Sequence, residues 1–200
     1  QGLYAFKDQA VRVIERGDHW GIGRIYSQVT GAVLPYGPEK GFGKTMGLAP
    51  YGKSHPGPVL EFHANDRGMT SDYSAFTTRS PIPRIVAEEV HPCSDREQVL
   101  EPYFARAAYD VQQECERQMI RMGQYAYDKT RCPNLCIAGG VGLNAPSNAR
   151  ILEETPFERL WITPVCSDTG ISFGLALWGY FQHIATRKSP RVSVSMTTAY

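Results

Sequence analysis

Two short stretches of the sequence combine glycines with a polar side chain in a pattern that suits a phosphorylated ligand. Residues 139–144 are Gly-Gly-Val-Gly-Leu-Asn, and residues 167–170 are Ser-Asp-Thr-Gly. Glycines let the backbone approach a ligand closely, and the N–H groups at the start of a helix attract negative charge. The carboxylate of Asp168 is in addition a suitable ligand for a divalent cation. These residue types predict a site for a phosphate or an adenylate.

Each stretch follows a short apolar run and precedes a helix signal, which predicts two strand–turn–helix units in tandem. The expected strands are residues 135–138, which should be buried, and residues 160–162. Parallel strands joined by right-handed crossovers place both turns at one edge of the sheet. The two turns should therefore face the same crevice.

Each candidate residue also has a purely structural interpretation. Gly139 and Gly140 could form an ordinary sharp turn. Asn144 could be the N-cap of the next helix, because Pro146 suits a first helical turn. Asp168 could cap the helix that follows it, since aspartate is favoured there by hydrogen bonding and by the helix dipole. The sequence alone leaves these interpretations open.

Apolar periodicity predicts the helices that would support the turns. Apolar residues recur at helical spacing over residues 21–34 and over the longest regular segment, residues 98–129. The charged residues of the long segment are interpreted as a solvated face. The helix after the glycine turn should direct Ile151 and Leu152 inward. A last helix over residues 169–184 is apolar nearly all round, so it should be buried.

The segment between these helices carries turn residues. Residues 41–53 contain several glycines and two lysines and are expected to form a loop. The spacing before Gly43-Lys44-Thr45 does not fit a P-loop and no strand precedes it, so a Walker A motif is rejected. A ligand-covering loop and an ordinary surface loop whose Met46 and Leu48 pack into the core both remain open. Residues 57–85 suggest a β-hairpin, with its turn at residues 65–68 and apolar runs over residues 59–62 and around Tyr73 and Phe76. Prolines at positions 81, 83 and 92 are interpreted as a connection.

Composition narrows the class of protein. With 200 residues, of which 42% are hydrophobic and 20% charged, the chain is expected to be one domain or one lobe of a larger protein. A net charge of +1 gives no general field for nucleic acid or an acidic membrane. The five cysteines form no disulfide framework, and no signal peptide or membrane-spanning run is evident. A cytoplasmic setting is expected.

Three motifs in order make the sequence similar to the NodU-type O-carbamoyltransferases. They are Met-Gly-Leu-Ala-Pro-Tyr-Gly at residues 46–52, the glycine run at 139–144, and the segment from Pro164 to Gly174. The resemblance implies an α/β fold, namely an actin-like ATPase (ribonuclease H-like) lobe in which a mixed sheet has helices on both faces. Residues 1–185 would be the second lobe, and residues 186–200 a linker toward a YrdC-like domain that the sequence lacks.

The resemblance also implies a reaction. In that family, ATP and carbamoyl phosphate give carbamoyladenylate at the YrdC-like domain, and the actin-like domain transfers the carbamoyl group to a hydroxyl of a small-molecule acceptor. Gly139, Gly140, Val141 and Asn144 would bind the adenylate. Asp168 would be one ligand of a divalent metal, iron in studied relatives, that polarises the carbamoyl carbonyl.

Other features of the family are changed or missing in this sequence. Gly142 stands where alanine is usual, Ala145 where cysteine is common, and Ser167 where glycine is usual. The family's His-x-x-x-His metal pair belongs to the first lobe, which is missing here, so no catalytic residue is assigned. The piece alone is therefore expected to be inactive.

Two other functions remain as alternatives. One is threonylcarbamoyl transfer to tRNA, which the near-neutral charge and the lack of a basic stripe disfavour. The other is a catalytically silent module that binds a nucleotide or a partner. Such a module should show no metal dependence.

Overall fold

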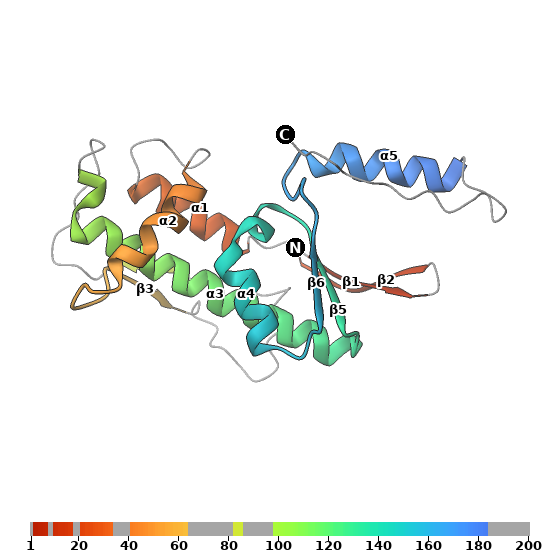
Figure 1. The fold of residues 1–200 in the computed structure, drawn as a ribbon, viewed down its shortest axis with the longest axis horizontal. Coiled ribbons are helices and arrows are strands. Elements are labelled where there is room, and N and C mark those ends of the chain that lie inside the picture. The colour runs from red at the N-terminus through yellow and green to blue at the C-terminus, as the bar shows by residue number, and fades with distance from the viewer. Residues whose placement is uncertain are drawn as a thin grey trace.

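A long central helix organises the computed structural model, which describes residues 2–7, 10–17, 21–33, 41–63, 82–85 and 98–183. This helix, α3 (Pro102–Thr130), runs through the middle of the molecule, and helices and small sheets surround it (Figure 1). The predicted α/β class is confirmed.

Three further helical elements pack along α3. They are α1 (Ile22–Val33), α2 (Phe42–Leu48) with the 3₁₀ turn Ala49–Gly52, and α4 (Ala145–Glu154). The helices predicted over residues 21–34 and 98–129 are confirmed. The second one begins at Pro102 because proline suits a first helical turn, and Gln98–Leu100 form a separate 3₁₀ turn before it. The apolar side of α3 supplies much of the core, including Phe104, Ala107, Ala108, Val111, Cys115 and Met119.

The prediction that the charges of α3 form a solvated face is wrong for three carboxylates. Asp110, Glu114 and Glu116 are all buried. Each is satisfied by hydrogen bonds, which is the condition under which a charged group is tolerated inside a protein. Asp110 Oδ2 accepts from the backbone N–H groups of Val59 at 2.7 Å and Leu60 at 2.9 Å.

The expected loop over residues 41–53 is instead helical, as α2 and the 3₁₀ turn. Leu48 is buried and Met46 is half-buried. Thr45 Oγ1 lies 3.0 Å from Thr30 Oγ1 of α1 in the interior. A Cβ atom added to Gly52 would lie only 2.0 Å from the carbonyl oxygen of Ala105 in α3. Packing on α3 therefore fixes this segment, and a ligand-covering loop is not what the structure shows.

The strands pair two by two. The antiparallel pairs are β1 (Gly2–Lys7) with β2 (Ala10–Arg16) and β3 (Leu60–His63) with β4 (Ile82–Ile85), and the parallel pair is β5 (Asn134–Ile137) with β6 (Arg159–Ile162). The prediction over residues 57–85 is confirmed only as an antiparallel pair within that range, because the partner of β3 is β4, a segment with Pro83 that was interpreted as a connection. The turn predicted at residues 65–68 and the apolar run around Tyr73 and Phe76 lie outside the described residues. Among the described residues, the strands form three two-stranded sheets and not the single mixed sheet that was expected.

The strand predicted as buried is buried on one face only. Leu135 and Ile137 of β5 pack against the core, whereas Cys136 faces outward. Its register partner in β6, Trp161, is 64% exposed. In α4, Ile151 is buried as predicted, but Leu152 is 43% exposed. The burial of β5 and the burial of Leu152 were overestimated for the same reason. Cys136, Trp161 and Leu152 line one open groove that no described element fills.

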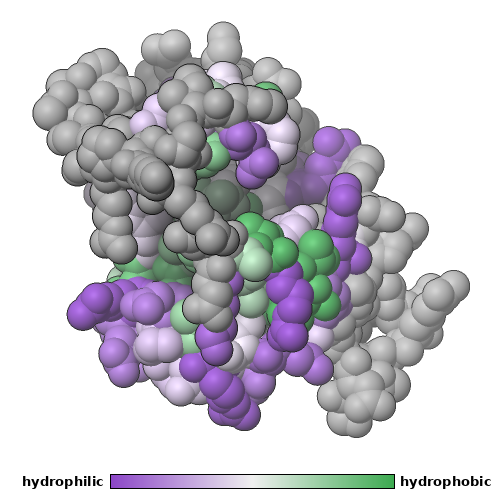
Figure 2. Space-filling model, turned by 90° about the vertical axis from the view of Figure 1, so that its right-hand side faces the viewer, coloured by the Kyte–Doolittle hydropathy of each residue, from purple (hydrophilic) through white to green (hydrophobic). Residues whose placement is uncertain are grey.

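Helix α5 (Gly170–His183) was predicted to be buried, and this prediction is wrong. It stands apart from the rest of the described chain (Figure 1). Four of its large apolar side chains are 57–63% exposed: Ile171, Leu175, Trp178 and Phe181. Figure 2 shows hydrophobic residues at the surface of the face seen from the right-hand side of Figure 1. Among the helices that the structure describes, none is both long and apolar enough to span a bilayer.

Candidate functional site

The two predicted turns lie at the same edge of the β5–β6 pair. The strands are parallel and in register from Asn134 opposite Arg159 to Ile137 opposite Ile162, so their carboxyl ends meet. The buried thiol of Cys166, in the second turn, donates to the carbonyl oxygen of Gly139, in the first, with Sγ and O 3.0 Å apart. The predicted convergence of the turns is therefore confirmed by a direct contact.

The glycine turn leaves open space on its outer side. Gly139 has φ of +98°, in a region that side chains with Cβ rarely adopt. A Cβ atom added at Gly139 or Gly140 would have no atom of the described chain within 4 Å. The run continues as a 3₁₀ turn, Gly140–Leu143, and then as α4. Because the first N–H groups of a helical segment have no partner within it, this open turn is suited to an anion.

Asn144 is the N-cap of α4, as one of its two predicted interpretations requires. Its Oδ1 accepts from Ser147 N at 3.1 Å and from Ser147 Oγ at 2.9 Å. Its Nδ2 donates to Oε1 of Gln112 in α3 at 2.9 Å. The side chain is 8% exposed. The cap does not exclude a ligand contact, because Nδ2 has a second hydrogen.

Val141 in the turn and Asn148 in α4 make further contacts around the turn. Val141 contacts α1 closely, since a Cβ atom added to Gly23 would lie 2.8 Å from Val141 Cγ2. Asn148 Nδ2 donates to Gly142 O at 2.7 Å. The Oδ1 atom of Asn148 is buried and has no hydrogen-bond partner among the described residues. This acceptor lies beside the glycine turn but is covered by the surrounding atoms.

Asp168 lies in the second turn, two residues after Cys166, and is exposed. Its carbonyl oxygen accepts from Ile171 N at 3.2 Å as α5 begins. No cluster of three or more His, Cys, Asp or Glu side chains that could hold a metal ion occurs in the part of the chain that the structure describes. The donor set of the described residues is thus too small for a metal site by itself, and Asp168 can contribute only one ligand.

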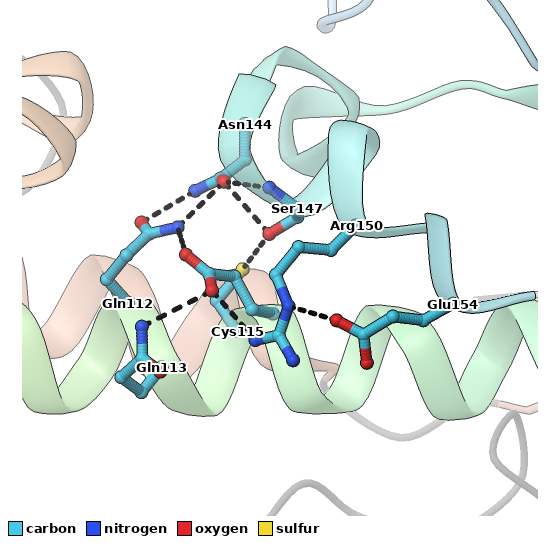
Figure 3. A network of polar contacts seen from close by, with 8 residues as sticks. Gln112, Gln113, Cys115, Asn144, Ser147, Arg150 and Glu154 are labelled. Atoms are coloured by element: carbon cyan, nitrogen blue, oxygen red, sulfur yellow. Dashed lines mark hydrogen bonds and ion pairs between the residues drawn. The ribbon is translucent and has the colours of Figure 1, made fainter. Parts of the chain in front are cut away.

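Sequence reasoning missed the buried polar residues behind the turn. Gln112 and Glu116 lie in α3, and Arg150 of α4 forms an ion pair with Glu116, with Nη1 and Oε2 2.9 Å apart (Figure 3). Burial raises the pKa of the Cys115 thiol to about 11, so this neighbouring thiol is neutral at pH 7. The available signal was the place of Gln112 directly after Val111, within the apolar stripe of the helix.

An open groove begins at the amino ends of the same two strands and extends along them. Its lining includes Asn134, Leu152 and Trp161. None of the predicted site residues lines it. This groove is therefore a different feature from the site at the glycine turn.

Replacing Gly142 by alanine is expected to lower the free energy of unfolding by about 1 to 3 kcal/mol, the usual cost of overpacking. The new Cβ would lie 2.5 Å from Cys166 Sγ and 3.0 Å from Ile137 Cγ2. Urea denaturation of Gly142→Ala, Cys166→Ala and the double variant measures the coupling. The double variant should regain part of the loss, because Cys166→Ala removes the nearest atom. Strictly additive effects of the two substitutions would contradict this account.

Comparison with known proteins identifies the family of the chain. Residues 1–177 match the protein family described as "Carbamoyltransferase N-terminus". The chain belongs to this family. The resemblance to carbamoyltransferases inferred from the three motifs is therefore confirmed.

Several curated relatives are similar to this carbamoyltransferase-family chain. It is 29% identical over 205 residues to an uncharacterized protein of Synechocystis sp., covering 91% of this chain and 32% of the relative. It is 29% identical over 156 residues to an uncharacterized protein of Methanocaldococcus jannaschii, covering 78% and 25%. Nodulation protein U of Sinorhizobium fredii is 44% identical over 43 residues, covering 22% of this chain and 8% of the relative. The chain thus spans about a third or less of the length of these relatives.

Proposed function

We propose that this chain is part of an O-carbamoyltransferase that transfers a carbamoyl group from carbamoyladenylate to a hydroxyl of a small-molecule acceptor. The carbamoyladenylate would be made from ATP and carbamoyl phosphate elsewhere in the protein. Family membership supports the transferase class, and similarity to Nodulation protein U supports the NodU type. The observation that carries the proposal is the contact of Cys166 with Gly139, because it joins two of the family motifs in one place.

The chemistry of the turn is compatible with an adenylate. Gly139 and Gly140 leave the backbone accessible, and the start of α4 would stabilise negative charge on the phosphate. The remaining N–H of Asn144 Nδ2 would give a polar contact. These residues would bind and orient the adenylate, and the transferred group would lie toward the turn that carries Asp168.

We further propose Asp168 as one ligand of a divalent metal, iron by resemblance to studied relatives. The other ligands would come from outside the described residues, since the described donor set does not form a site. Residues 1–185 would then be the second lobe of an actin-like domain, and residues 186–200 a linker toward a YrdC-like domain. On this proposal the chain alone does not turn over.

The test measures carbamoyl transfer by the full-length protein. Labelled carbamoyl phosphate, ATP and a panel of hydroxylated small molecules are supplied, and the labelled product is quantified with and without ferrous ion. Asp168→Ala should lower the rate at least about 100-fold, as expected for the loss of a ligand to a Lewis acid. Asp128→Ala is the matched control, because Asp128 is an exposed carboxylate in α3 whose ion pair with Arg131 is at the surface.

The outcomes separate the parts of the proposal. Equal activity of Asp168→Ala and the unsubstituted protein removes Asp168 from the mechanism. ATP binding without transfer to any acceptor, and without an effect of metal, favours a silent nucleotide-binding module. Transfer that depends on tRNA and weakens steeply with salt favours the threonylcarbamoyl alternative.

A further inference from the structure

Asn144 is held by the carboxamide of Gln112 through two reciprocal hydrogen bonds. Asn144 Nδ2 donates to Gln112 Oε1 at 2.9 Å, and Gln112 Nε2 donates to Asn144 Oδ1 at 3.0 Å. Both side chains are buried. Figure 3 shows the pair between α3 and the start of α4. The two bonds together fix the plane of the Asn144 amide as well as its position.

The orientation of Gln112 is fixed in turn by two other residues. Tyr26 of α1 donates its hydroxyl to Gln112 Oε1 at 3.0 Å, and Gln112 Nε2 donates to Glu116 Oε1 at 2.7 Å. A flipped Gln112 carboxamide would place its oxygen against the Glu116 carboxylate and its NH₂ against the Asn144 NH₂. Only one orientation therefore satisfies the network.

Gln112 has no hydrogen-bonding capacity left for a ligand. Its two N–H donors are used by Asn144 and Glu116, and its oxygen accepts from Asn144 and Tyr26. Asn144 differs, because one N–H of its Nδ2 is not used by Gln112. Gln112 is therefore expected to act on the bound nucleotide through Asn144, its hydrogen-bond partner at the end of the turn.

We propose that Gln112 is the positioning residue of the nucleotide site, in that it orients Asn144 and anchors the end of the glycine turn to α3. The inference rests on the proposed function, which places the adenylate at this turn. Tyr26 extends the support to α1, the helix that also contacts Val141 at Gly23. Thus α1 supports the middle of the turn at Val141, and α3 supports its end at Asn144.

The test is ATP binding by the full-length protein, measured by calorimetry with ATP itself as the probe. Because the proposed function also places an ATP-consuming site elsewhere in the protein, the isotherms are fitted with two sites, and each Kd below is that of the site at the glycine turn. Gln112→Met keeps the length of the side chain but removes all its hydrogen bonds, and it should raise the Kd for ATP about tenfold. Asn144→Ala should raise the Kd by at least as much. In an Asn144→Ala background, Gln112→Met should change the Kd less than about twofold, because its effect passes through Asn144.

Gln118→Met is the matched control. Gln118 is also a buried glutamine of α3, and its Nε2 donates to Glu114 Oε1 at 2.8 Å, whereas it has no contact with the turn among its described hydrogen bonds. Both Met variants should lower thermal stability, but only Gln112→Met should weaken ATP binding. Should Gln112→Met fail to fold, Tyr26→Phe removes a single bond to Gln112 and should raise the Kd about two- to threefold.

The results distinguish failure of the inference from failure of the proposed function. Weaker ATP binding by Asn144→Ala together with unchanged binding by Gln112→Met, or additive effects in the double variant, overturns the positioning role alone. Unchanged ATP binding by Asn144→Ala overturns both, because the adenylate would then lie elsewhere.

Discussion

Gly52→Ala is expected to lower the free energy of unfolding by about 3 kcal/mol, at the upper end of the range for overpacking. The new Cβ would lie 2.0 Å from the carbonyl oxygen of Ala105, 2.4 Å from its carbonyl carbon and 2.7 Å from Arg106 Cα. These are backbone atoms of α3, so no change of rotamer can relieve the contact. The 3₁₀ turn would have to move away from the helix. Urea denaturation followed by circular dichroism measures the loss.

Gly47→Ala is the control for this prediction. Gly47 belongs to the same motif and lies in α2, but an added Cβ would have no atom of the described chain within 4 Å. Alanine favours helix over glycine by about 1 kcal/mol, so this variant should be as stable as the unsubstituted protein or slightly more so. Equal losses in the two variants would show that close packing on α3 is not the reason for Gly52.

Asp110→Asn is expected to cost about 2 to 4 kcal/mol of stability, as for other disrupted buried charge networks. Asp110 Oδ2 accepts from two backbone N–H groups, those of Val59 and Leu60, and Oδ1 accepts from Arg106 Nε at 2.6 Å. An asparagine has the same shape, but its NH₂ group must face one of these donors. The comparison of free energies of unfolding at pH 7 measures the effect.

The matched control for Asp110→Asn is Asp128→Asn. Asp128 is in the same helix and forms an ion pair with Arg131 at 3.5 Å, with both side chains about half exposed or more. Exposed pairs of this kind contribute less than about 1 kcal/mol. A similar small effect of both substitutions would mean that the Asp110 carboxylate does not secure the entry into β3.

Local patterns were sufficient to predict the frame of the site. The apolar runs that became β5 and β6 are each followed by a turn signal, and parallel pairing then requires both turns to share one edge. The cap at Asn144 could also be predicted, because asparagine before a proline in a first helical turn is a local signal. These features depend on residues close together in sequence.

Features that depend on distant partners could not be predicted in this way. The burial of Asp110 follows from two amide groups about 50 positions earlier in the chain. The helical state of α2 follows from the packing of Leu48 and the neighbouring 3₁₀ turn on α3, which overrides the low helix propensity of its glycines. The role of Gln112 likewise depends on Asn144, 32 residues away.

The exposure of α5 has a consequence for the acidic residue that precedes it. A helix of 14 residues is marginal in water unless tertiary contacts hold it, and most of the large apolar side chains of α5 face solvent. Contacts within the described chain therefore stabilise this helix only weakly, and its backbone amides are expected to exchange with solvent faster than those of α3. Because Asp168 lies two residues before this helix, local opening of α5 would also change the position of the Asp168 carboxylate relative to Gly139.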